Sequence, residues 1–114
     1  GAGVSLPRGY DEARRLNLVN LHPWHLLSDK EFDYLAAGLS TRYPARSVVP
    51  FARRADNDDV ACFVARDPEQ GAGQVVVIHD FASAGSEVVV RLPGFWEWFR
   101  YAVNEMIEWQ QAAA

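Results

Sequence analysis

Val48-Val-Pro-Phe-Ala-Arg-Arg-Ala-Asp-Asn-Asp-Asp-Val-Ala-Cys-Phe63 is the stretch that decides the fold class, together with Val75-Val-Val-Ile-His-Asp-Phe81. Its apolar runs are rich in β-branched and aromatic residues, and clusters of Asp, Asn, Gly and Pro separate them. This pattern is typical of antiparallel strands joined by short turns. We expect strands near residues 47–54, 60–66, 74–81 and 87–92, paired as a meander because the connections between them are short.

The run at residues 74–81 is apolar on both faces of the expected strand. Val75 and Val77 point to one face, and Val76 and Ile78 point to the other. A strand of this kind is expected at the centre of a sheet that is covered on both sides. Pro50 has no backbone N–H to give to a ladder, so the strand at 47–54 is expected at an edge.

Two helices frame the strands. Ser28-Asp-Lys-Glu31 has the pattern of a capping box, an apolar stripe follows at helical spacing, and Pro44 ends the helix. Residues 95–110 form a second helix with an apolar arc of about half its circumference. A short helix is also expected over residues 10–21. The sequence therefore predicts an α+β fold, with an antiparallel meander sheet of at least four strands flanked by N-terminal helices and a C-terminal amphipathic helix.

Five residues of these elements are expected in the core: Cys62, Ile78, Phe95, Phe99 and Met106. Because truncation of a buried Phe removes apolar contacts and leaves a cavity, Phe99→Ala is expected to cost about 3–5 kcal/mol.

Length and composition indicate one domain, residues 1–114. The chain has 114 residues, of which 49% are hydrophobic, enough for a single core. It contains no apolar run near the ~20 residues that span a bilayer, and its start lacks the pattern of a secretory signal. The single cysteine, Cys62, excludes an internal disulfide and fits a reducing compartment. We expect a cytoplasmic protein without a membrane partner, in which residues 1–9 are flexible.

Charge is unevenly distributed along the chain. Residues 1–54 hold eight Arg/Lys and five Asp/Glu, a net charge of +3, whereas residues 55–114 hold three Arg and ten Asp/Glu, a net charge of -7. Phosphate contacts need clustered Lys and Arg, so the acidic half argues against a nucleic-acid partner. It fits either a basic protein partner or an ordinary solvated acidic surface.

The residues that could carry chemistry do not form a recognisable catalytic or metal motif. His22 and His25 are too few for a zinc site, and the turn at residues 56–59 lacks the Gly and Glu of a calcium loop. His79 and Asp80 are adjacent on a strand, so they point to opposite faces and are expected as a buried polar anchor. Gly71-Ala-Gly73 is too short for a phosphate loop. We therefore expect no metal, no cofactor and no catalytic residue. A small enzyme that uses His79 and nearby carboxylates, Asp58 or Glu87, remains an alternative.

Four runs of the chain resemble, in their order, the SUKH superfamily, which includes the Smi/Knr-like cell-wall regulators of yeast and many bacterial immunity proteins. The runs are Val48-Val-Pro-Phe-Ala-Arg-Arg54, Asp58-Asp-Val-Ala-Cys-Phe63, Val75-Val-Val-Ile-His-Asp80 and Phe95-Trp-Glu-Trp-Phe99, within residues 24–109. The Asn-Gly-Gly turn of many members is absent. The resemblance implies a non-enzymatic binding protein, of the immunity type that neutralises a polymorphic toxin by direct binding. A regulatory or scaffold module is the alternative that the eukaryotic members imply.

The expected partner-binding residues are acidic groups and aromatic anchors. Asp56, Asp58 and Asp59 in the turn, with Glu87 at the start of the last strand, can lie on one rim of a meander sheet. Trp96 and Trp98 lie at the edges of the apolar arc of the last helix, where one of them can be left uncovered. Acidic groups steer a basic partner, and exposed Trp is a favoured hot-spot residue. We expect a basic toxin domain as the partner.

Overall fold

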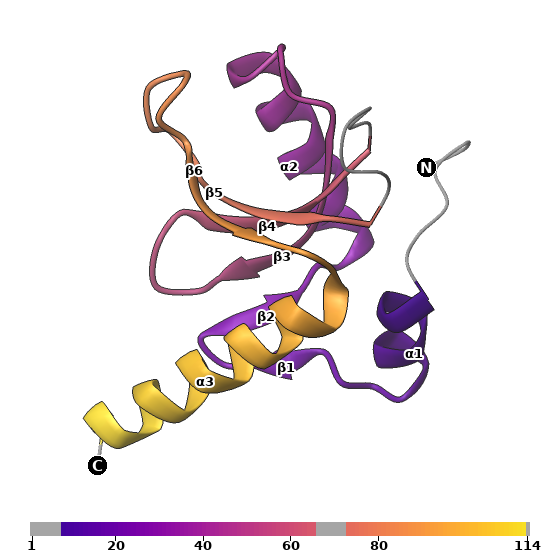
Figure 1. Ribbon diagram of the computed structural model, residues 1–114, viewed down its shortest axis with the longest axis vertical. Helices are drawn as coiled ribbons and strands as arrows, with labels where there is room; N and C mark the ends of the chain where they lie inside the picture. The colour runs from indigo at the N-terminus through magenta and orange to yellow at the C-terminus, as the bar shows by residue number, and fades with distance from the viewer. Residues whose placement is uncertain (1–7, 66–72, 114) are drawn as a thin grey trace.

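The computed structural model of the protein describes residues 8–65 and 73–113. Their elements are α1 (Arg8–Arg15), β1 (Asn20–Leu21), β2 (Trp24–Leu26), α2 (Asp29–Arg42), β3 (Val48–Arg54), β4 (Asp59–Val64), β5 (Val75–His79), β6 (Val88–Leu92) and α3 (Phe95–Ala113). The strands form one sheet in the order β1-β2-β3-β4-β5-β6, with every neighbouring pair antiparallel (Figure 1). The predicted α+β fold and meander sheet are confirmed.

The four predicted strands correspond to β3–β6, and two short strands precede them. The helix expected over residues 10–21 is wrong in extent, because α1 ends at Arg15 and the chain turns at Asn17, whose φ is 59°. Asn20–Leu21 and Trp24–Leu26 then pair with each other. Strands of two or three residues are too short for an alternating pattern to be read. Arg8 and Gly9 belong to α1 rather than to a flexible start. Some predictions concern residues outside the described ones. These are residues 1–7 of the start expected to be flexible, the end of the strand expected at 60–66, and most of the turn at 71–73.

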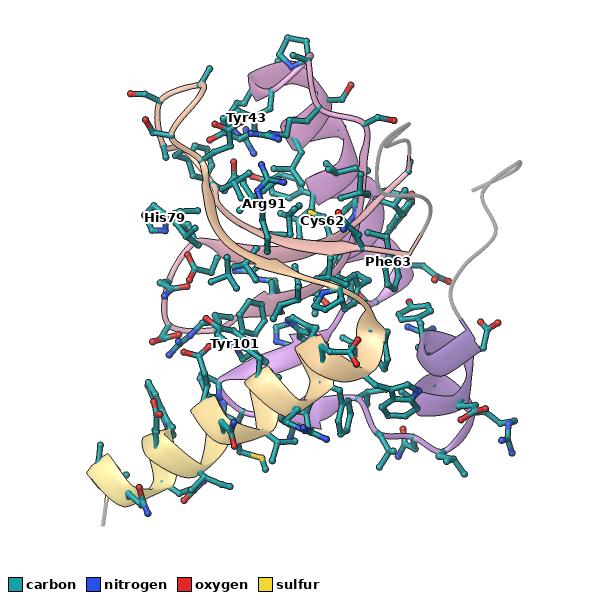
Figure 2. All side chains as sticks on the ribbon, viewed as in Figure 1. Tyr43, Cys62, Phe63, His79, Arg91 and Tyr101 are labelled. Atoms are coloured by element: carbon teal, nitrogen blue, oxygen red, sulfur yellow. The ribbon has the colours of Figure 1, made fainter. Side chains whose placement is uncertain are left out.

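The sheet is covered on both faces (Figure 1). On one face, α2 buries Leu35 and Leu39 in a cluster with Val76 and Ile78. On the other face, residues of α1 and α3 pack in a second cluster that contains Val75 and Val77. The prediction that β5 is a central strand covered on both sides is therefore confirmed. Consecutive residues of β4 divide in the same way: Cys62 belongs to the α2 cluster and Phe63 to the α3 cluster (Figure 2).

The start of α2 has the predicted capping box. The Ser28 hydroxyl accepts a hydrogen bond from the Glu31 backbone N–H at 3.2 Å, and the Glu31 carboxylate accepts one from the Ser28 backbone N–H at 3.0 Å. These two bonds satisfy donors that a helix start otherwise leaves unpaired. The cap sets where α2 begins. From that start, α2 places Tyr34 and Arg42 near the end of β5.

Three of the five predicted core residues are buried. Cys62, Ile78 and Phe95 are confirmed, whereas Phe99 and Met106 are only partly buried at the edge of the core. The correction follows from how α3 docks. Its buried residues are Phe95, Trp98 and Ala102, and its C-terminal part extends away from the sheet (Figure 1). None of the helices within residues 8–65 and 73–113 is both long enough and apolar enough to cross a membrane.

The strand that contains Pro50 was expected at the edge of the sheet, and this prediction is wrong. β3 lies between β2 and β4, but β2 pairs only with Ala52–Arg54. The register of β3 against β4 shifts between Pro50 and Ala52. Pro50 therefore lies where β3 extends past β2, beside a bulge, and its missing N–H removes no bond to β2.

Candidate functional site

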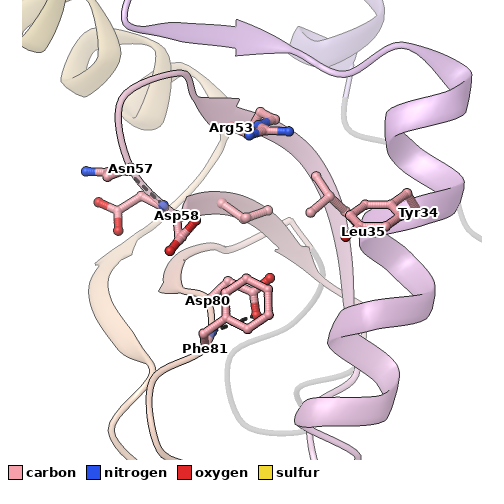
Figure 3. A pocket seen from close by; sticks show the side chains of 9 residues that line it. Tyr34, Leu35, Arg53, Asn57, Asp58, Asp80 and Phe81 are labelled. Carbon is pink, nitrogen blue, oxygen red and sulfur yellow. Dashed lines mark hydrogen bonds between the residues drawn. The ribbon is translucent and has the colours of Figure 1, made fainter.

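A pocket of about 210 Å³ lies between α2 and one end of the sheet. At this end β3 ends, β4 begins, β5 ends and β6 begins, and we call it the rim. The charged and aromatic groups that line the pocket are Tyr34, Arg53, Asp58, Asp59, Asp80 and Phe81. Figure 3 shows Tyr34, on α2, across the pocket from Asp58 and Phe81. The rim thus brings together aromatic and acidic groups from three separate segments, with Arg53 of β3 beside them.

The turn from β3 to β4 forms through the side-chain chemistry of Asp and Asn. The Asn57 side-chain oxygen accepts a hydrogen bond from the Asp59 backbone N–H at 2.8 Å, which closes the turn. Asp56 turns away from the pocket, because Arg54 donates to both of its carboxylate oxygens at 2.8 and 3.0 Å and also donates to Glu105 on α3 at 3.0 Å. Arg54 therefore partly neutralises Asp56.

Asp58 is the uncompensated acid of this turn. Its side chain is exposed and lines the pocket. Within the described residues, its carboxylate has no hydrogen-bond or ion-pair partner. Its backbone carbonyl accepts from the Asp80 N–H at 3.0 Å, which joins the turn to the end of β5. Asp58 thus presents its carboxylate to solvent beside the pocket.

Asp59 is paired with His79 across β4 and β5. The two residues are register partners, and His79 Nδ1 lies 2.7 Å from the Asp59 carboxylate. This hydrogen bond is the main cause that raises the pKa of His79 above its ordinary value. His79 is exposed at the outer end of β5 (Figure 2), so its predicted burial is wrong. It is the last residue of the strand and lies past the cover that buries Val75 and Val77.

Asp80, the residue after His79, is buried, with 3% of its surface exposed. Arg42, at the end of α2, donates to its two carboxylate oxygens at 2.7 and 2.6 Å. The bond to Asp80 raises the pKa of Arg42. A buried carboxylate without such a partner would be strongly unfavourable, so this ion pair fixes α2 against the end of β5.

Phe81 follows Asp80 and lies largely in solvent. Its side chain is 64% exposed, its φ is 69°, and its ring lies 4.1 Å from the Arg42 guanidinium carbon. Tyr34, across the pocket, is 73% exposed. Sequence reasoning missed both. The available signals were that Tyr34 lies off the apolar stripe of α2, and that Phe81 is a large apolar residue where the strand gives way to a turn.

Glu87 does not belong to the exposed surface, which corrects the prediction. Its backbone is at the rim, where its carbonyl accepts from the His79 N–H at 2.7 Å, but its carboxylate is buried. Arg46 donates to it at 2.8 Å and the Gly85 N–H at 2.6 Å. The bond from Arg46 is the main cause that lowers the pKa of Glu87. A partner cannot reach this charge without breaking the ion pair.

The two candidate tryptophans have different environments. One of the two was expected to be left uncovered, and it is not Trp98. The Trp98 ring is fully buried, with edge contacts to Phe51 at 4.9 Å and Trp24 at 5.6 Å, so Trp98 cannot bind a partner as predicted. Trp96 is 45% exposed. However, it follows the end of β6 that lies opposite to the rim, and packs beside Gly9 of α1. Trp96 and the acidic turn therefore do not form one compact patch.

The remaining candidate ligands and bases are engaged elsewhere. The His22 ring contacts Trp109 at 5.2 Å, and His25 Nε2 lies 2.9 Å from the Glu31 carboxylate. Residues 8–65 and 73–113 contain no group of three or more His, Cys, Asp or Glu that could hold a metal ion. His79 is not among the residues that line the pocket of Asp58.

Comparison of the chain with protein-family models, with curated proteins and with solved structures finds no match. An unpaired carboxylate beside two exposed rings suits recognition of a basic surface, because carboxylates attract Lys and Arg and rings supply apolar contact.

Proposed function

We propose that this protein is a non-enzymatic binding domain that associates stoichiometrically with a basic protein partner. The binding surface is the rim surface, which consists of Tyr34, Asp58 and Phe81. Asp56 and Asp59 lie beside it, paired with Arg54 and His79. The observation that carries the proposal is the exposure of two aromatic side chains beside Asp58, whose carboxylate pairs with no described residue. Aromatic residues dominate binding hot spots, and acidic groups around them steer a basic partner.

The partner that fits best is a toxin domain with a basic active-site surface, which makes the protein a bacterial immunity protein of the cytoplasm. The support for this step is the ordered resemblance to the SUKH superfamily, together with the net charge of -7 in residues 55–114. An immunity protein acts by covering a toxin, so its own catalytic groups are not required. The rim surface supplies what such a role needs, an acidic surface with apolar anchors.

The test is a binding titration against the product of the neighbouring gene, with rates measured at low and high salt. Asp58→Lys is the informative variant, because Asp58 has no partner among the described residues, whereas replacing Asp59 would also break its bond to His79. Two opposite unit charges 4 Å apart in water attract each other by about 1 kcal/mol. Asp58→Lys replaces this attraction to a basic group with an equal repulsion, a change of about 2 kcal/mol, so association should slow by up to about 30-fold at low salt.

Glu97→Lys is the matched control. Glu97 is an exposed acid in the first turn of α3, which follows the end of β6 opposite to the rim, and its reversal changes the net charge by the same amount. It should leave association close to that of the parent. The effect of Asp58→Lys should shrink at high salt, because the Debye length falls from about 10 Å at 0.1 M to about 3 Å at 1 M. If the parent does not bind the product, the immunity function is wrong. If Asp58→Lys and Glu97→Lys behave alike, the assignment of the rim surface is wrong.

A further inference from the structure

We infer that Phe81 is a pre-organised anchor for the partner and that Arg42 is the positioning residue that holds its ring. This inference rests on the proposed function and extends it to the residues that determine affinity. The partner it fits has an apolar socket bordered by Lys or Arg side chains. The socket takes the Phe81 ring, and the basic border faces Asp58 across the same pocket.

The backbone of Phe81 is the first observation. Its φ of 69° lies in the left-handed region, which is unfavourable for a bulky L-residue and is ordinarily taken by Gly, Asn or Asp. Four residues later, the same loop uses a glycine, Gly85, for a φ of 99°. At position 81 the chain instead carries a phenylalanine. Burial does not explain this choice, since 64% of the residue is exposed.

The second observation is the set of contacts that orients Phe81. The Asp80 carboxylate accepts a hydrogen bond from the Phe81 backbone N–H at 2.9 Å, and the same oxygen accepts from Arg42 Nε at 2.7 Å. The Arg42 guanidinium also lies over the Phe81 ring, with its central carbon 4.1 Å from the ring centroid. One side chain of α2 therefore holds both the backbone and the ring of Phe81, through an ion pair with Asp80 and a cation–π contact.

The third observation is that α2 makes room for Arg42. Gly38 lies one turn before Arg42, and a Cβ at this position would lie 2.5 Å from the Arg42 Nη2 atom. Glycine in the middle of a helix is unfavourable, because it loses more backbone entropy than alanine. Two locally unfavourable choices, Gly38 in a helix and Phe81 at positive φ, thus converge on the same guanidinium. A ring ordered before binding loses little further freedom in the complex, which is how pre-organisation increases affinity.

Phe81→Gly separates binding from folding. Glycine accepts the left-handed backbone, so the variant should fold and melt within a few degrees of the parent. Its Kd for the product of the neighbouring gene should nevertheless rise by roughly 30-fold or more, the loss that defines a hot spot. Trp96→Ala is the matched control, because it removes an exposed ring at the opposite end of the sheet, and its Kd should stay within about twofold of the parent.

Arg42→Lys tests the positioning role. Lysine keeps the charge for Asp80 but loses the planar stack on Phe81, so Kd should rise by roughly three- to tenfold. This loss should disappear when Arg42→Lys is made in the Phe81→Gly background, which a merely structural role of Arg42 would not predict. In the free parent, NMR should show the Arg42 side-chain protons shifted upfield by the ring, and Phe81→Gly should abolish that shift.

The outcomes distinguish this inference from the proposed function. If the parent does not bind the product, the proposed function fails. If the parent binds and Phe81→Gly binds equally well, Phe81 is not the anchor. If the Arg42 protons show no ring-dependent shift, or if Arg42→Lys weakens binding equally in both backgrounds, Arg42 does not position Phe81.

Discussion

Truncation of Phe51 should reveal how strongly this fold depends on its aromatic core. Phe51 is 1% exposed, and its ring stacks on Phe63 at 4.1 Å with an angle of 15°. It also has edge contacts with Trp98 at 4.9 Å and Tyr10 at 5.9 Å. Phe→Ala in a core costs about 3–5 kcal/mol, and each aromatic pair adds about 0.5–1.5 kcal/mol beyond burial. We expect Phe51→Ala near the upper end, about 4–5 kcal/mol.

Phe99→Ala is the matched comparison, because it removes the same atoms from a partly exposed position. Solvent already reaches Phe99, so little cavity remains after truncation, and the cost falls to about 1–2 kcal/mol of lost burial. This revises the 3–5 kcal/mol expected for Phe99 from the helical pattern alone. For a domain of this size, 1 kcal/mol shifts Tm by about 4 °C. Phe51→Ala should therefore lower Tm by about 16–20 °C and Phe99→Ala by about 4–8 °C.

The assay is thermal unfolding together with urea unfolding, from which the m-value of each variant is compared with that of the parent. A constant m-value shows that the change lies in stability rather than in the unfolded state. A domain of this length has a total unfolding free energy of about 6–17 kcal/mol, so Phe51→Ala remains measurable if the parent lies in the upper part of that range. Equal losses for the two variants would refute the reasoning, because they would show that burial within the aromatic cluster does not set the cost.

Two further predictions concern titratable groups. The pKa of His79 is raised in the folded state, so the His79–Asp59 pair stabilises the fold fully below the ordinary His pKa of about 6.5. This contribution is lost as pH rises through the raised value. Asp59→Asn should lower the pKa of His79 in an NMR titration, whereas an unchanged pKa would contradict the pairing. Burial raises the pKa of the Cys62 thiol, so a thiol reagent should label the native protein slowly and the denatured protein fast. Rapid labelling of the native protein would show that Cys62 is accessible.

The elements that sequence reasoning found are those with local signals. The capping box of Ser28 and Glu31 needs only residues three apart, and the observed bonds are the predicted ones. The two-faced apolar pattern of Val75 to Ile78 needs only strand alternation, and it correctly predicted a central strand. β1 and β2 were missed because two or three residues carry no period.

The candidate site was predicted less well than the fold, because exposure depends on partners distant in the chain. Asp58 and Glu87 are both acids at the rim. Glu87 forms a buried ion pair with Arg46, which lies 41 positions earlier in the chain, whereas no described residue pairs with Asp58. Trp96 and Trp98 lie near each other on α3, and the docking angle of the helix decides which one is covered. A helical pattern defines an apolar arc, but it does not determine which residues at the edges of the arc contact the sheet.

The sequence by itself determined the class of the fold, the start of α2, the central position of β5 and the acidic character of the turn after β3. Each of these depends on backbone preferences and on contacts within a few residues. Only the tertiary structure decided that Asp58 pairs with no residue of 8–65 or 73–113, that Glu87 and Trp98 are buried, and that Phe81 is held in solvent. The Arg42–Asp80 bond joins residues 38 positions apart, and the Arg46–Glu87 bond joins residues 41 apart. Such pairs form only when α2 packs on the sheet, so their effect on charge and exposure does not exist in any local segment.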